Sequence, residues 1–154
     1  MLDVKDGKAL ILSDRVLTSH QYHSSNSEIT WENCSMRAYL NGSFMDNTFT
    51  ADEKKYIAEQ RIENKNNPTH GTTGGIATID KIFLLSIEEV NTYFTDDSSR
   101  IAYNMDNNAS VWWLRSPGLL SYSAARVGRD GGVYSHGNFV DSNDGVRPAL
   151  WLNL

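Results

Sequence analysis

Cysteine, proline and long apolar runs are scarce in this 154-residue sequence, and each scarcity excludes a class of protein. The single cysteine, Cys34, cannot form an internal disulfide or a cysteine-based zinc knuckle. No apolar run approaches the roughly 18 to 20 residues that cross a bilayer, so we expect no membrane insertion. Because 40% of the residues are hydrophobic and 21% are charged, we expect a single folded domain over residues 1–154.

A basic surface is also missing. The net charge is −5, and it is uneven: residues 1–99 carry 9 Lys/Arg against 15 Asp/Glu, whereas residues 100–154 carry 5 against 4. Neither part has the basic stripe that neutralises a phosphate backbone, so we expect no nucleic-acid partner. No Glu follows Glu89, so the stretch DSNDG at 141–145 lacks the distal carboxylate of a calcium loop and is interpreted as a turn.

Motifs for catalysis and metal binding are incomplete. No serine lies in a Gly-x-Ser-x-Gly elbow, and the Gly-rich stretch at 63–75 is not followed by Gly-Lys-Ser/Thr, so we interpret that stretch as a loop. His20 and His23 lie three residues apart without a third ligand nearby, which favours loop histidines over a metal site. We therefore expect no metal and no cofactor, and we interpret Cys34 as a small buried residue near a helix start.

The first third of the chain predicts a hairpin and a helix. Asp6-Gly7 between apolar residues is typical of a tight turn, followed by a strand over 9–12. Little chain precedes this turn, which is consistent with excision from a longer protein. Apolar residues at steps of three to five predict a helix over 31–44 that ends at Asn41-Gly42.

Two capping boxes predict two further helices. Thr50-Ala-Asp-Glu53 opens a helix expected to run through Tyr56 and Ile57, and Ser86-Ile-Glu-Glu89 opens a short helix through Val90 and Tyr93. The polar stretch over 96–109 is expected to cross the surface without regular structure.

The last 44 residues predict short strands. Val111 to Leu114 is one strand, and valines then recur between spacers that combine Gly with Asp or Asn, residues that accept tight turns. Apolar residues alternate from Val146 to Leu154, which predicts a final strand that Pro148 places at an edge or a bulge. The fold class is therefore α+β, with helices packed on a small twisted antiparallel sheet of short C-terminal strands joined by long loops.

The spacers between these strands are the candidate binding surface. If the valines face the core, the spacer side chains face outward, and exposed Tyr and Arg mixed with Ser, Gly and Asn are typical of an adaptable contact surface. The alternative is that the aromatic rings pack on neighbouring loops. The candidate ligand-binding residues are Leu119, Leu120, Tyr122, Ser123, Arg126, Arg129, Tyr134, His136, Asn138, Phe139, Asp141 and Asn143.

The motif WWLRSPG at 112–118 is interpreted as a frame for this surface. Adjacent strand residues point to opposite faces, so one of Trp112 and Trp113 should enter the main core and the other should cover the far side of the sheet. Arg115 and Arg147 each follow an apolar strand residue and precede a proline. We expect both guanidinium groups to make mostly buried hydrogen bonds to backbone or carboxylate partners.

Four segments carry a family resemblance: TWENCSMRAYLNGSF at 30–44, IDKIFLLSIEEVNTYF at 79–94, WWLRSPG at 112–118 and GVRPALWL at 145–152. Together they resemble domain of unknown function 6273, a bacterial family common in gut bacteria and their phages. That family is similar to the C-type lectin fold and to its formylglycine-generating-enzyme branch. The resemblance implies a lectin-like scaffold in which residues 112–115 and 146–149 form the frame.

The resemblance also implies a way to vary the surface. In the variable proteins of diversity-generating retroelements, adenine-directed mutation rewrites the C-terminal stretch of a lectin-like domain but cannot produce Lys, Glu, Gln, Met or Trp from Asn codons. Residues 118–145 contain none of these five. Two lectin-fold activities lack their residues here: the formylglycine-generating oxidases need a cysteine pair, and the calcium-dependent sugar lectins need Glu-Pro-Asn or Gln-Pro-Asp with Trp-Asn-Asp.

The function expected from the sequence is non-enzymatic binding of a protein or glycan, on a cell surface, through the C-terminal residues. One alternative is a structural module of a larger bacterial surface or phage protein. Another is an enzyme of the formylglycine-generating type, or a hydrolase that uses His70 or His136.

Overall fold

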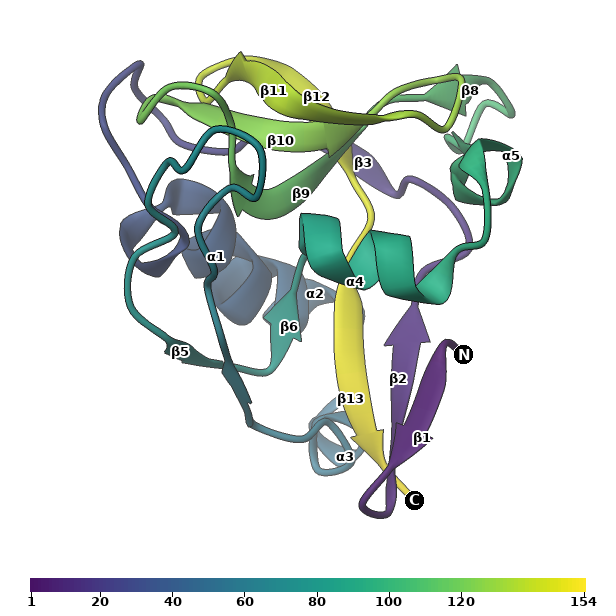
Figure 1. Cartoon of the computed structure of the whole chain (residues 1–154). Helices are drawn as coiled ribbons and strands as arrows, with labels where there is room; N and C mark the ends of the chain where they lie inside the picture. The colour runs from purple at the N-terminus through teal and green to yellow at the C-terminus, as the bar shows by residue number, and fades with distance from the viewer.

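The computed structural model describes residues 1–154 and is built mostly from strands, with a few short helices. The strands are β1 (Asp3–Lys5), β2 (Lys8–Leu12), β3 (Thr18–Gln21), β4 (Gln60–Ile62), β5 (Thr78–Asp80), β6 (Ile82–Phe83), β7 (Ala102–Tyr103), β8 (Ala109–Ser110), β9 (Trp112–Pro117), β10 (Ser123–Val127), β11 (Val133–Phe139), β12 (Asn143–Val146) and β13 (Ala149–Asn153). They form a lower sheet in the order β1-β2-β13-β6, an upper sheet in the order β11-β10-β9-β12-β3, and two short ladders, β4-β5 and β7-β8 (Figure 1).

The helices all lie between β3 and β7 in the sequence. They are the 3₁₀ turn η1 (Trp31–Asn33), α1 (Ser35–Tyr39), the π turn η2 (Leu40–Phe44), α2 (Met45–Thr48), α3 (Ala51–Lys54), α4 (Ile87–Tyr93) and α5 (Asp97–Arg100). The predicted mixture of helix and strand is confirmed. The expectation that the sheet belongs to the last third of the chain is wrong, because β1, β2 and β3 each join a C-terminal strand or its neighbour.

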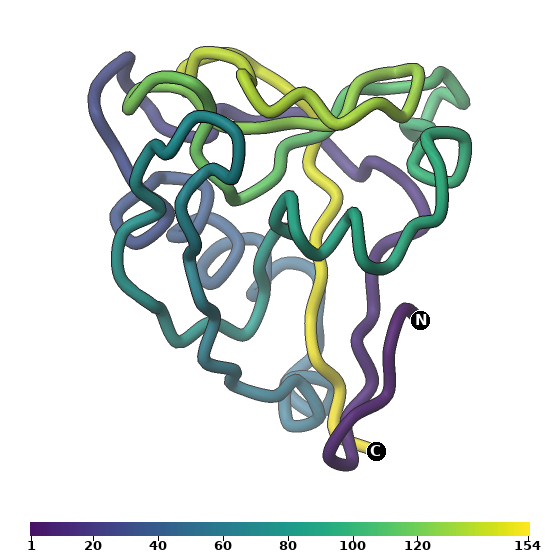
Figure 2. The backbone as a smooth tube through the Cα atoms, viewed as in Figure 1, coloured from purple at the N-terminus to yellow at the C-terminus, as the bar shows by residue number.

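The two ends of the chain run side by side in the lower sheet (Figures 1 and 2). Strand β2 pairs antiparallel with β13, and Leu10 lies opposite Trp151. The predicted hairpin turn is present, with Asp6 at φ 51° and Gly7 at φ 71°, the left-handed conformations that this turn requires. The lower sheet therefore fastens both ends of the chain beneath the upper sheet.

The final strand is divided between the two sheets. Val146 ends β12 in the upper sheet, and Ala149 begins β13 in the lower sheet. Of the two alternatives predicted at Pro148, the edge position is wrong, because β13 lies between β2 and β6. The strand is instead interrupted at Pro148, whose carbonyl accepts a hydrogen bond from the Ser13 N–H. The upper sheet is also not purely antiparallel, since β12 pairs parallel with β9.

The helix predicted over 31–44 does not stop at Asn41-Gly42. It continues as η2 and α2 to Thr48, with a kink at Gly42, whose φ of −116° and ψ of −110° are not helical. Asn41 explains the continuation, because its side chain donates to Ile82 O and accepts from the N–H groups of Lys81 and Ile82. Gly42 thus bends the helix while Asn41 ties it to the strand β6.

Both predicted capping boxes are present, at Thr50 and at Ser86. The second helix runs to Tyr93 as expected, whereas the first ends at Lys54. Tyr56 and Ile57 leave the helix because the chain there turns to meet β13, where Ile57 forms a bridge with Leu152. The loop over 63–75 is confirmed. The stretch over 96–109 is more regular than expected and contains α5 and the β7-β8 hairpin.

Both tryptophans of WWLRSPG are fully buried in the same hydrophobic core. The Trp112 indole N–H donates to Arg100 O, and the Trp113 indole N–H donates to His20 O. The expectation that only one would enter the main core is wrong, because packed segments cover both sides of β9: Arg147 stacks on Trp112, and Tyr22 meets Trp113 edge-on.

Arg115 and Arg147 are both buried as predicted, and the predicted hydrogen bonds are confirmed for Arg115, whereas Arg147 makes one and leaves Nη1 buried without a partner. Arg115 donates to two carbonyls, Leu84 O and Glu63 O, and forms a forked pair with the Glu89 carboxylate. Arg147 donates from Nε to Ser13 O. Both arginines therefore connect the upper sheet to segments far away in the sequence.

Candidate functional site

The upper sheet displays most of the predicted binding residues. Strands β10 and β11 pair antiparallel, with Ser123 opposite Phe139 at one end and Val127 opposite Val133 at the other. Eleven of the twelve predicted residues are exposed or half-buried. They do not form one continuous site, because the ends of β10 are four residues, or about 13 Å, apart.

One end of β10 carries an apolar group, which we call the apolar end: Leu119, Leu120, Tyr122 and Phe139. Leu119 and Phe139 are each about half exposed, at 50% and 49%, and the Tyr122 ring stacks on Phe139 with centroids 6.0 Å apart. The loop over 63–75 contacts this end through hydrogen bonds. Asn67, buried and unforeseen from the sequence, donates to Pro117 O and Ser135 O.

The other end of β10 borders a hollow of about 600 Å³, which we call the β10–β12 hollow. Three of the predicted residues, Arg126, Arg129 and Tyr134, line it. Its full lining is Val111, Arg126, Gly128, Arg129, Asp130, Tyr134 and Asp144. The hollow therefore combines two arginines, two aspartates and one aromatic ring.

Asp144 organises the hollow. Its side chain is only 8% exposed, and its Oδ2 accepts from Arg126 Nη1 at 3.0 Å and from Asn138 Nδ2 at 3.2 Å. Strands β10, β11 and β12 each supply one of these residues. Sequence reasoning assigned Asp144 to a turn; its position directly before Gly145 gave no signal that its carboxylate lies beside Arg126.

Asp130 and Tyr134 form the outer wall at the β10–β11 turn. The Gly132 N–H donates to Asp130 Oδ1 at 3.0 Å, and the Tyr134 hydroxyl donates to Asp130 Oδ2 at 2.9 Å. These bonds lower the pKa of the Asp130 carboxyl, the backbone bond most, and the bond to Asp130 raises the pKa of the Tyr134 hydroxyl. The pair thus stays hydrogen-bonded as carboxylate and phenol near neutral pH.

The remaining predicted residues have different positions. Ser123 is buried, and its hydroxyl is bonded to the backbone of Leu120, so it supports the β9–β10 turn and does not face a ligand. His136 and Asn143 are exposed. Asp141 is half-buried beside β3, where its carbonyl accepts from Gln21 Nε2.

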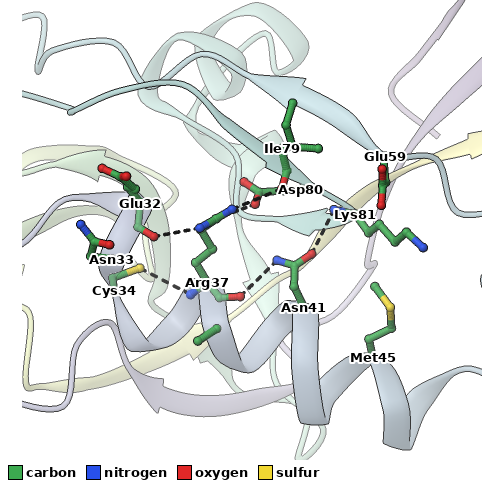
Figure 3. A pocket seen from close by; sticks show the side chains of 11 residues that line it. Glu32, Asn33, Cys34, Arg37, Asn41, Met45, Glu59, Ile79, Asp80 and Lys81 are labelled. Atoms are coloured by element: carbon green, nitrogen blue, oxygen red, sulfur yellow. Dashed lines mark hydrogen bonds and ion pairs between the residues drawn. The ribbon is translucent and has the colours of Figure 1, made fainter.

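A second hollow, of about 650 Å³, opens beside α1 and β5 (Figure 3). Asp80 lies at its base with a fully buried side chain, and accepts from Arg37 Nε at 2.5 Å and Trp31 Nε1 at 2.9 Å. The Asn41 amide is also fully bonded, as the dashed lines in Figure 3 show in part. The polar groups at the centre of the second hollow are therefore already hydrogen-bonded within the protein, and we interpret this hollow as a structural contact between α1 and β5.

Cys34 lines the second hollow as the residue that caps α1. It is buried as predicted, and its Sγ accepts from the Arg37 N–H. Burial raises the pKa of the thiol to about 12, so the group is a neutral thiol at pH 7 rather than a nucleophilic thiolate.

The histidines and carboxylates do not gather. His70 is exposed and its Nε2 lies 3.4 Å from Ser135 Oγ, while the His136 and Tyr134 rings meet in a T-shaped contact. His23 is bonded through Nδ1 to the Ser35 hydroxyl, and His20 stacks on Tyr39. No group of three or more His, Cys, Asp or Glu side chains is placed to hold a metal ion.

The fold and this surface define a mixed α/β domain that presents an upper sheet with a charged hollow at one end and an apolar group at the other. The chain belongs to the family described as Domain of unknown function (DUF6273), whose model matches residues 6–154. No curated protein and no solved structure matches the chain. None of its helices is long and apolar enough to cross a membrane.

Proposed function

We propose that this domain is a non-enzymatic binding module whose ligand, a protein or a glycan, contacts the outside of the upper sheet. The observation that carries the proposal is the division of β9 to β12 into two kinds of residue. The frame residues, among them Trp112, Arg115 and Arg147, are buried and tied to distant segments. The spacer residues between them, apart from the buried Ser123, are exposed or half-buried and chemically diverse, as a preorganised contact surface requires.

We further propose that the scaffold is C-type-lectin-like and that its surface is of the kind diversified by retroelements. The pairing of β2 with β13 at the base, beneath a separate small sheet, supports the first part. The exposure of residues within 118–145, the stretch free of Lys, Glu, Gln, Met and Trp, supports the second. A neighbouring reverse transcriptase gene, with a near-copy of the 112–150 coding stretch that differs only at adenines, is the expected genomic finding. Differences at all four bases would contradict diversification.

Cell binding tests the main proposal. Fluorescently labelled domain is incubated with intact bacterial cells and with cultured animal cells, and bound label is measured by flow cytometry. The triple variant Arg129→Ala, Tyr134→Ala, Phe139→Ala removes three side chains from the two ends of the surface. It is expected to lose at least tenfold of the binding while its circular dichroism spectrum stays unchanged.

The matched control substitutes three exposed side chains elsewhere. Val4, Tyr56 and Ile79 are 54%, 60% and 56% exposed and lie outside the upper sheet. Their triple alanine variant should bind like the wild type. Full binding by the upper-sheet variant, or equal loss by both variants, would place the ligand contact elsewhere.

A further inference from the structure

Two residues that line the β10–β12 hollow, Asp144 and Arg126, each keep a hydrogen-bonding atom that makes no bond within the protein. Both hydrogen bonds to the Asp144 side chain end on Oδ2. Oδ1 accepts no hydrogen bond and is not fully buried, so solvent or a ligand can reach it. Arg126 uses Nη1 for this ion pair, and its Nη2 makes no bond within the protein. The ion-paired residues thus keep one acceptor atom and one donor atom free of bonds within the protein.

The charges of the hollow cancel. Arg126 and Arg129 face Asp130 and Asp144, and Arg129 forms no hydrogen bond or ion pair of its own. An anion would meet two carboxylates, and a cation would meet two guanidinium groups. A neutral ligand avoids both repulsions, and a hydroxyl group, which donates one hydrogen bond and accepts others, matches the neighbouring acceptor and donor.

Tyr134 adds an apolar surface next to these polar atoms. Its hydroxyl is fixed on Asp130, and the His136 ring contacts it edge to face, with centroids 5.6 Å apart. A ring held in this way offers a flat face for C–H groups at low entropy cost. The volume of about 600 Å³ lies within the range of roughly 300–1,000 Å³ that small-ligand sites occupy.

We propose that the β10–β12 hollow binds a neutral glycan directly. Vicinal hydroxyls donate to Asp144 Oδ1 and accept from Arg126 Nη2, Arg129 contacts a further hydroxyl, and the sugar ring lies on Tyr134. This inference rests on the proposed function and narrows its ligand to one class. A protein ligand would instead favour the apolar end, where Leu119 and Phe139 are exposed.

A printed array of neutral oligosaccharides, probed with the full chain in buffer containing EDTA, tests the inference. The strongest oligosaccharide on the array is then titrated calorimetrically against single variants. Tyr134→Ala and Asp144→Asn should each weaken binding at least tenfold, and Arg129→Ala several-fold. Phe139→Ala reports on the apolar end, and the control Tyr56→Ala, which removes an exposed aromatic side chain outside the upper sheet, should stay within twofold of the wild type.

Three results would overturn the inference: no binding to any neutral oligosaccharide, binding that appears only when EDTA is left out of the buffer, or binding that depends on Phe139 and not on Tyr134. Asp144→Asn removes a nearly buried charge, so its thermal unfolding is measured first. If it does not fold, the exposed Arg129 and the half-buried Tyr134 decide the outcome.

The cell-binding experiment separates this inference from the proposed function. If the array is negative but cell labelling still falls in the upper-sheet triple variant, the glycan inference fails and the binding module stands with a protein ligand. If cell labelling is insensitive to that variant, both fail.

Discussion

The guanidinium carbon of Arg147 lies 4.9 Å from the centre of the Trp112 ring. It also lies 5.7 Å from the centre of Phe94, so the charged group is enclosed between two aromatic rings. Arg147, which directly follows β12, thus contacts Trp112, the first residue of β9. Packing and electrostatics act in opposite directions at this position.

Substitution of Arg147 should separate the two effects. Burial lowers the pKa of its guanidinium to about 10, and Nη1 is buried without a partner, so the charge is poorly compensated. Arg147→Ala leaves a void beside Trp112 and should cost about 3 kcal/mol in the free energy of unfolding. Arg147→Met keeps most of the packing and should stay within about 1 kcal/mol of the wild type. Urea unfolding at pH 7 measures both, and equal losses in both variants would show that the charge itself stabilises the contact.

The Cys34 thiol gives a stability that depends on pH. Its pKa is about 9.0 in the unfolded chain and about 12 when folded, so the stabilisation is complete below pH 9 and declines as pH rises toward 12. Cys34→Ser keeps an acceptor at the start of α1 but does not ionise in this range. The difference in unfolding free energy between wild type and variant should shrink by about 1.4 kcal/mol between pH 8 and pH 10.

The comparison with the variant is necessary because the pKa values of the Tyr22 and Tyr93 hydroxyls are also raised in the folded protein. Burial raises the pKa of both hydroxyls, and both tyrosines remain in the variant. Urea titrations at four pH values supply the measurement. A constant difference across the range would mean that the thiol is not desolvated in the folded state.

Local signals in the sequence predicted part of this fold. The two capping boxes and the Asp6-Gly7 turn were predictable because each depends on residues within four positions of one another. The burial of Arg115 and Arg147 was also predictable, since each directly follows a buried apolar strand residue and a guanidinium suits fixed carbonyl acceptors.

Contacts between distant segments were not predictable in this way. Asn41 reads as a helix stop, yet its amide bonds to the backbone of Ile82 some forty residues later and the helix continues. Asn67 lies in a loop-like sequence, but it holds Pro117 O and Ser135 O. The local sequence predicts that Asp144 is a turn residue, but in the fold its carboxylate accepts a hydrogen bond from Arg126. The role of each of these three residues depends on hydrogen bonds to residues far away in the sequence, which the local sequence does not encode.

Arg115 should be among the most sensitive positions for stability. Its guanidinium is bonded to Glu89 through both terminal nitrogens, at 2.5 and 3.1 Å, and to two backbone carbonyls. Arg115→Ala leaves these acceptors unpaired in a nearly dry site and should cost about 4 kcal/mol. Arg115→Lys keeps the charge but not the forked geometry and should cost about 2 kcal/mol.

Arg129 provides the control for this series, because it is exposed and makes no bond within the protein. Arg129→Ala should change the unfolding free energy by no more than about 0.5 kcal/mol. Chemical denaturation of the three variants tests the order Arg115→Ala, Arg115→Lys, Arg129→Ala. Similar stabilities for Arg115→Ala and Arg129→Ala would contradict the role assigned to the frame.

A side chain at Gly137 should affect both the stability of the fold and the binding surface, because Gly137 lies within β11. Its φ is +74°, and a Cβ atom added there would lie 2.0 Å from Ala124 O, opposite the irregularity between Ala124 and Arg126. Gly137→Ala therefore combines a strained backbone with a clash and should cost more than about 2 kcal/mol. Gly7→Ala has a similar φ of +71° with nothing within 4 Å, so it should cost only about 1 kcal/mol.

The two glycine variants also differ in what they do to the surface. Asn138 follows Gly137 and donates to Asp144, so a shift of β11 should disturb the β10–β12 hollow as well as the fold. Gly137→Ala should weaken oligosaccharide binding at temperatures where the variant is still folded, whereas Gly7→Ala, in the hairpin of the lower sheet, should bind like the wild type. Thermal unfolding and calorimetric titration on the same samples measure both effects. Normal binding by folded Gly137→Ala would show that the hollow does not depend on the register of β11.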